Sequence, residues 1–77
     1  MTVTGQLRLP PVDVELRDVG SLVILDPLTE AAESWLSDNL DPEVLRWGRG
    51  FICEPRYVEP IVLGLQHDGL TVSPAPF

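Results

Sequence analysis

A chain of 77 residues with 44% apolar residues is the size of one folded domain and is too apolar for a disordered segment. No apolar run approaches the roughly 20 residues that a membrane-spanning helix needs, and a single cysteine excludes an intrachain disulfide framework and a multi-cysteine metal site. Twelve acidic residues against five arginines give a net charge of −7, which disfavours direct binding to nucleic acid phosphates.

The acidic balance has two interpretations, and charge alone leaves both open. It keeps a small domain in solution, or it competes for a basic groove on a partner that normally holds nucleic acid. We expect no signal peptide, because MTVTGQLRLPP has no basic region followed by a long apolar core, and therefore expect a cytoplasmic protein with one domain over residues 1–77.

The first predicted elements are strands. Residues 1–11 predict an edge strand that a proline pair ends, because proline cannot donate to a sheet ladder. Alternation over 12–17 predicts a half-buried strand with one charged face. Residues 18–20 predict a tight turn, and the apolar run at 21–25 predicts a central strand that is covered on both faces and ends at 26–27.

A helix follows with a clear beginning. Thr29 is suited to cap it, and Glu30 and Glu33 favour the positive end of the helix dipole. Asn39 is suited to close it. The apolar stripe on one face consists of Ala32, Trp35, Leu36 and Leu40.

Two connecting segments lead to the next strand. Asp41-Pro42-Glu43 predicts a fresh helical turn through Leu45, since proline is favoured at the first helical position. Residues 47–50 predict a loop or bend before a strand at 51–53.

Residues 51–72 predict a compact β-α-β unit. Its helix begins near Tyr57 or Pro60, because proline is tolerated only in the first turn. Gly64 lowers helix propensity and therefore indicates close packing against a neighbour. Gly69 is placed to stop the helix before a last strand at 70–72.

Together these elements predict an α+β domain: a mostly antiparallel sheet of four or five short strands with two helices packed on one face. Residues 73–77 are expected to form a flexible tail. A two-layer domain of this size leaves apolar surface and is compatible with a homodimer.

Residues of catalytic type do not form a pattern, so we expect no enzyme activity, no cofactor and no metal. His67, the only histidine, falls in the last turn of the second helix, where it favours the dipole. Cys53 lies in an apolar run that is typical of a buried, inert thiol. Gly48-Arg49-Gly50 is too short for a phosphate-binding loop.

Three neighbouring positions, together with Trp47, stand out as candidate contact residues. Glu54, Arg56 and Tyr57 predict either an ion pair with a tyrosine packed nearby or a recognition corner, since arginine and tyrosine are enriched in binding hot spots. Trp35 is expected in the core, whereas Trp47 is expected to contact a partner.

Short motifs carry a family resemblance. They are CEPRYV at 53–58 and DGLTV at 68–72, preceded by TEAA at 29–32 and by Trp35-Leu36. With them, residues 22–72 resemble a family of small phage- and prophage-borne proteins, most of which have no assigned activity. The strands predicted over 3–16 and Pro60 depart from that pattern, which leaves room for a specialised role of the N-terminal hairpin.

The resemblance implies a genetic context. Small acidic phage proteins without catalytic residues resemble anti-defence proteins, including anti-CRISPR proteins, which occupy the basic channel of a host CRISPR effector complex in the cytoplasm of the infected bacterium and block target DNA binding. The alternatives are a phage structural or assembly accessory protein, or a regulator of a host enzyme. The residues expected to contact the partner are Asp13, Glu15, Asp18, Glu30, Glu33, Asp38, Trp47, Glu54, Arg56 and Tyr57.

Overall fold

A computed structural model describes residues 12–74 of the chain, so the edge strand predicted within 1–11 and the last three tail residues lie outside the described residues. The strands are β1 (Val14–Asp18), β2 (Val23–Pro27), β3 (Arg46–Trp47), β4 (Gly50–Cys53) and β5 (Val72–Ser73). The helices are α1 (Glu30–Asn39) and α2 (Val58–His67), and the short 3-10 helix η1 (Pro55–Tyr57) precedes α2.

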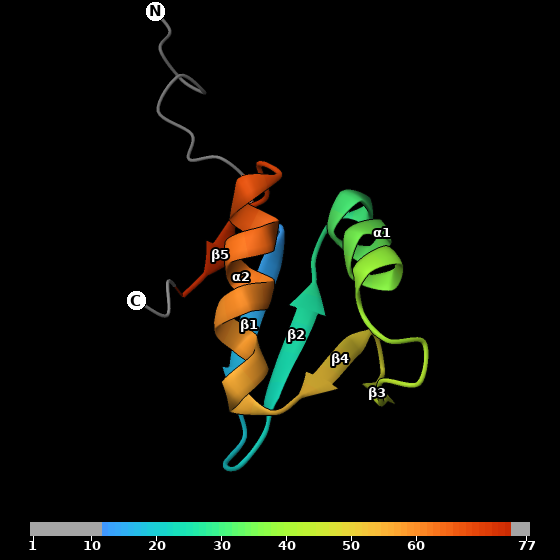
Figure 1. Ribbon diagram of the computed structural model, residues 1–77, viewed down its shortest axis with the longest axis vertical. Coiled ribbons are helices and arrows are strands. Elements are labelled where there is room, and N and C mark those ends of the chain that lie inside the picture. The colour runs from blue at the N-terminus through green and yellow to red at the C-terminus, as the bar shows by residue number, and fades with distance from the viewer. Residues whose placement is uncertain (1–11, 75–77) are drawn as a thin grey trace, which may run out of the picture.

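The strands form a sheet in the order β3-β4-β2-β1-β5. All neighbouring pairs are antiparallel except β1 and β5, which are parallel. Both helices lie on the same side of this sheet (Figure 1). The predicted α+β domain with a mostly antiparallel sheet is therefore confirmed.

The predicted β-α-β unit has an unusual span. Strand β5 runs parallel to β1, and β1 and β4 are both antiparallel to β2, so β4 and β5 point the same way. Helix α2 connects them across the two strands that lie between, β2 and β1. The crossover therefore places β5 beside β1, where β5 forms one edge of the sheet.

The apolar core lies between the helices and one face of the sheet. Its members come from both helices and four strands: Val14, Leu25, Ala32, Leu36, Phe51, Cys53, Val58, Val62, Leu65 and Val72. Ile24 is 1% exposed but is not part of this cluster. Strand alternation points Ile24 to the opposite face, which no described helix covers.

Strand β2 corrects the position of the predicted central strand, which was expected over 21–25. The strand begins at Val23 and runs through Pro27, which pairs with Val14. The N–H of Val14 points away from β2 and donates to the carbonyl of Thr71 at 3.0 Å. The Val14–Pro27 pair therefore needs no donor from proline, which allows Asp26 and Pro27 to be the last two residues of the strand.

Helix α1 begins and ends as predicted. The Ala32 N–H donates to Thr29 Oγ1 at 3.2 Å, which caps the first turn. Asn39 is the last residue of α1, and its Nδ2 donates to the carbonyl of Trp35 at 2.8 Å. Local capping chemistry therefore fixes both ends of this helix.

The helical turn predicted after α1 is wrong. Asp41 instead closes a non-helical turn, since its Oδ1 accepts from the Glu43 N–H and its carbonyl accepts from the Val44 N–H. The Ile52 N–H donates to the carbonyl of Leu45 at 2.9 Å. This bond draws the segment toward the sheet, and β3 then pairs with β4 through a tight turn in which Gly48 has φ +62°.

Helix α2 begins and ends where its proline and glycine predict. Pro60 lies in its first turn, and Gly69 follows its end with φ +86°. The Leu70 N–H then donates to the carbonyl of Leu65 at 2.9 Å. No helix in residues 12–74 is long and apolar enough to cross a membrane.

Trp35 of α1 packs directly on Gly64 of α2. A Cβ atom on Gly64 would lie 2.9 Å from Cζ2 of the indole, closer than packing allows. The indole Nε1 also donates to Asp68 Oδ2 at 2.6 Å, and this hydrogen bond is the main reason why the pKa of Asp68 is lowered from its ordinary value. The close packing predicted for Gly64 is therefore confirmed.

Candidate protein-binding surfaces

Asp13 is held within the fold. Its Oδ1 accepts from the Thr29 hydroxyl at 2.8 Å, and its Oδ2 accepts from the Thr71 N–H at 2.8 Å. Its carbonyl accepts from the Leu28 N–H at 2.7 Å. The residue therefore joins the start of β1 to the beginning of α1 and to the approach to β5, and its side chain is occupied.

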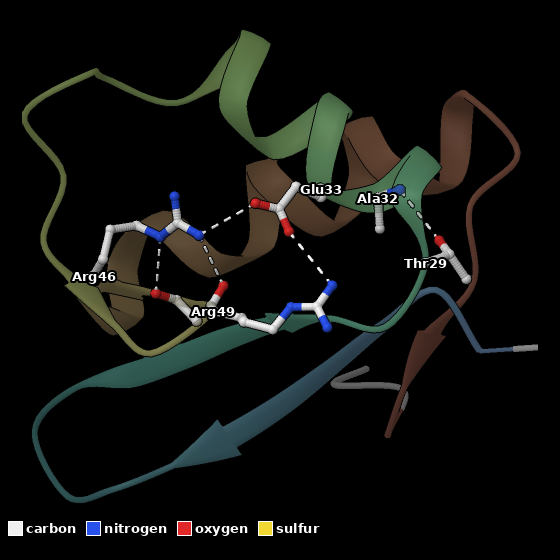
Figure 2. A network of polar contacts seen from close by, with 6 residues as sticks. Thr29, Ala32, Glu33, Arg46 and Arg49 are labelled. Carbon is white, nitrogen blue, oxygen red and sulfur yellow. Dashed lines mark hydrogen bonds and ion pairs between the residues drawn. The ribbon is translucent and has the colours of Figure 1, made fainter.

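Two other predicted contact residues also have partners inside the chain. Asp18 Oδ1 accepts from the Gly20 N–H at 3.0 Å, in the turn where Gly20 has φ +104°. Figure 2 shows Glu33 of α1 between Arg46 and Arg49, with ion-pair distances of 3.4 and 3.7 Å. Arg46 also lies 3.7 Å from the centroid of the Phe51 ring.

Every arginine in residues 12–74 lies within 4 Å of a carboxylate. The ion pairs are Arg17–Asp26, Arg46–Glu33, Arg49–Glu33 and Arg56–Glu54. The carboxylates in the same range that make no ion pair are Asp13, Glu15, Asp18, Glu30, Asp38, Asp41, Glu43 and Glu59. All of these except Asp13 are exposed, so the surface offers carboxylates in excess and few free positive charges.

Four of these exposed acids belong to one stretch of chain. Glu30 and Asp38 lie on α1, and Asp41 and Glu43 lie in the turn that follows it. We call these four residues the acidic side of α1. Glu15 lies on β1, and its alternation with the buried Val14 points it to the face of the sheet away from the helices.

A groove of about 550 Å³ lies between the end of α1, the turn after it and the start of α2. We call it the corner groove. Its apolar lining includes Leu40, Val44 and Ile61, which also pack against the core. The acidic members of its lining are Asp41, Glu43 and Glu54.

The predicted recognition corner opens onto this groove. Glu54 and Tyr57 both line it, and Arg56 pairs with Glu54 at 3.3 Å. The Arg56 guanidinium lies 4.9 Å from the centroid of the Tyr57 ring. The predicted ion pair is confirmed, and Tyr57 is nevertheless 48% exposed, which keeps its ring available at the surface.

Asp41 and Glu43 line this groove as surface groups, which the sequence did not indicate. Both residues were assigned to a helical turn, although the same Asp-Pro-Glu motif also suits an exposed turn. The structure therefore adds two carboxylates to the corner that Glu54 and Tyr57 already marked.

Trp47 lies on a different surface. It is 65% exposed and lines a shallow groove of about 500 Å³ together with Arg17, Ile24, Asp26 and Arg49. This outer groove involves β2 and the turn between β3 and β4, apart from the corner groove. The structure therefore does not bring Trp47 together with Tyr57.

No group of three or more histidine, cysteine, aspartate or glutamate side chains that could hold a metal ion occurs among residues 12–74. Cys53 is buried, and burial followed by the nearby charge of Glu54 raises the pKa of its thiol. His67 is exposed at the end of α2, where its Nδ1 lies 3.3 Å from Asp68 Oδ1.

Comparison of the chain with protein-family models, with curated proteins and with solved structures gives no match.

Proposed function

We propose that this protein acts by binding a basic surface of a partner protein through the acidic side of α1. The observation that carries this proposal is the pairing of every described arginine with a carboxylate, while Glu30, Asp38 and Glu43 form no ion pair. A surface with this charge pattern attracts lysine and arginine side chains and repels phosphates.

The partner that we propose is a host defence ribonucleoprotein, a CRISPR effector complex in the cytoplasm of an infected bacterium. Such complexes hold their target DNA in a positively charged channel. The resemblance of residues 22–72 to small phage-borne proteins supplies the genetic context for an anti-CRISPR protein. The net charge of −7 supplies the physical means to occupy that channel.

Inhibition in this proposal combines electrostatic and steric effects. Carboxylates on α1 pair with channel arginines and lysines that would otherwise contact the DNA backbone. The domain then fills space that the duplex needs. Because exposed charges are screened by salt over about 10 Å at 0.1 M, association should slow as ionic strength rises.

A competition assay tests the proposal. Purified CRISPR effector complexes are mixed with labelled target DNA and increasing amounts of the protein, and DNA binding is measured. We expect DNA binding to fall as the protein is added to the effector type that it recognises. Full DNA binding by every effector type at saturating protein would contradict the proposed partner.

A matched pair of double variants tests the surface. Glu30→Lys with Asp38→Lys reverses two acids on α1, and Glu15→Lys with Glu59→Lys makes the same net change elsewhere. Each pair contains one acid from the first turn of a helix, Glu30 or Glu59, so their effects on helix stability are comparable. We expect about a tenfold or greater loss of inhibition for the α1 pair alone.

A further inference from the structure

We propose that the corner groove is the recognition pocket for a short basic segment of the partner that carries bulky apolar side chains. This inference rests on the proposed function, because it names the part of the basic partner that the domain grips. The acidic side of α1 supplies attraction, and the corner groove supplies a place for side chains to be buried.

The floor of the groove is already built from packed residues. Leu40, Val44 and Ile61 each pack against the core on one side and line the groove on the other. An apolar side chain entering from solvent would bury their exposed surface without displacing the core. The volume of about 550 Å³ lies within the range of roughly 300–1,000 Å³ that binding pockets occupy.

The acidic side chains that line the corner groove favour a positively charged binding partner. Asp41 and Glu54 each use one named carboxylate oxygen within the chain, Oδ1 for the Glu43 N–H and Oε1 for Arg56. Glu43 makes no ion pair among residues 12–74. Arg56 is not a member of the lining, and its guanidinium is held by Glu54 and Tyr57. An acidic segment would therefore be repelled, and a neutral one would leave the carboxylates without partners.

Tyr57 gives the groove an anchor for binding. Its ring is 48% exposed and lines the groove, and the Arg56 guanidinium lies 4.9 Å from the ring centroid. Partly exposed tyrosines that become buried on association are common hot spots. We therefore expect the apolar side chain of the partner segment to pack against Tyr57 and Ile61.

Nuclear magnetic resonance of the isotope-labelled full chain tests this inference with defined peptides. The probe is an amphipathic peptide of about 15 leucines and lysines, and the comparison peptides are oligolysine and a leucine–glutamate peptide of equal length. We expect the leucine–lysine peptide to shift signals of groove residues in the chain, such as those of Val44 and Tyr57. The leucine–glutamate peptide should leave the spectrum unchanged.

Two single variants and two matched controls sharpen the test. Tyr57→Ser removes the anchor, and Glu43→Gln removes one rim charge. Leu63→Ser removes an apolar side chain on α2 that is 52% exposed and outside the groove lining, and Glu15→Gln removes a distant charge. We expect Tyr57→Ser to weaken peptide binding about tenfold or more, Glu43→Gln to weaken it by less, and both controls to change it less than twofold.

The outcomes separate this inference from the proposed function. Equal binding of oligolysine and the leucine–lysine peptide, with shifts spread over α1, would overturn the groove while leaving the acidic surface intact. Peptide binding in the groove without inhibition of any effector complex would support the groove and contradict the proposed partner. Absence of peptide binding, in a chain that still blocks DNA binding, would overturn the groove alone.

Discussion

The carboxylate of Asp13, next to β1, and the carboxylates on the acidic side of α1 differ in what they contact. The first bonds to other parts of the fold, and the second face solvent. Asp13 accepts hydrogen bonds from Thr29 and from Thr71, which lies 58 residues further along the chain. Asp38 is exposed, and no hydrogen bond or ion pair of its side chain occurs within residues 12–74. The first region uses its charge to hold the fold, and in the second region Glu30, Asp38 and Glu43 make no ion pair, while Asp41 also accepts from the Glu43 N–H.

This difference shows why a count of acidic residues does not locate a binding surface. From the sequence, Asp13, Asp18 and Glu33 are all expected to contact a partner. The structure gives each of them a partner inside the chain. Only the acids without such partners can change binding while leaving stability unaffected, and the predictions below separate the two groups.

The largest expected effect is at Asp13. Asp13→Ala removes two hydrogen bonds to a carboxylate and should lower the free energy of unfolding by about 2–3 kcal/mol. Asp38→Ala should change it by less than about 0.5 kcal/mol. Urea unfolding of both variants measures this difference, and equal destabilisation would remove the distinction between the two regions.

The next largest effect concerns the contact between the helices. Gly64→Ala places a Cβ atom 2.9 Å from the Trp35 indole, and the strain should outweigh the gain in helix propensity by about 1 kcal/mol. In a Trp35→Phe background, the same substitution should become neutral or stabilising. A double-mutant cycle by urea unfolding measures the coupling, and additive effects would show that the indole does not require the glycine.

A smaller effect is expected at Glu33. Glu33→Gln breaks the ion pairs with Arg46 and Arg49, which are both exposed at the surface, so the free energy of unfolding should fall by less than about 1 kcal/mol. Thermal unfolding at low and high salt checks this value, because the loss should shrink as salt rises. A loss larger than that of Asp13→Ala would contradict the small contribution expected of ion pairs at the surface.

The smallest effect is a pH dependence at Asp68. Hydrogen bonds from Trp35 and His67 lower its pKa in the folded state, so its contribution to stability is present above the unfolded pKa. That contribution is lost as pH falls through the lowered pKa. Wild-type protein should therefore lose more stability than Asp68→Asn as pH drops below about 4. Parallel pH profiles of the two proteins would contradict the link between Trp35 and Asp68.

The sequence predicted features whose causes lie within a few residues. Thr29 caps α1, Pro60 limits the start of α2 and Gly69 ends it, because each acts on its own turn of backbone. The apolar stripe of α1, which includes Trp35, also predicted the face of the helix that packs against the core. Local chemistry was therefore sufficient for the helices and for the fold class.

Features that depend on distant contacts were not predictable in the same way. Residues 41–45 carry a local signal for helix, but the bond from Ile52 to Leu45 draws them toward the sheet. The pairing of β5 with β1 and the role of Asp13 depend equally on residues far apart in the chain. The corner groove was missed for this reason, since Asp41 and Tyr57 line it from two segments, the turn after α1 and η1, that β3 and β4 separate in the chain.

The rate at which the protein associates with its effector complex, measured over a range of salt concentrations, tests the central claim most directly. Wild-type protein and the Glu15→Lys, Glu59→Lys control should both associate more slowly as salt rises, with similar slopes. The Glu30→Lys, Asp38→Lys variant should associate more slowly than the control at low salt, with a shallower slope. Identical slopes for the two double variants would contradict recognition through the acidic side of α1.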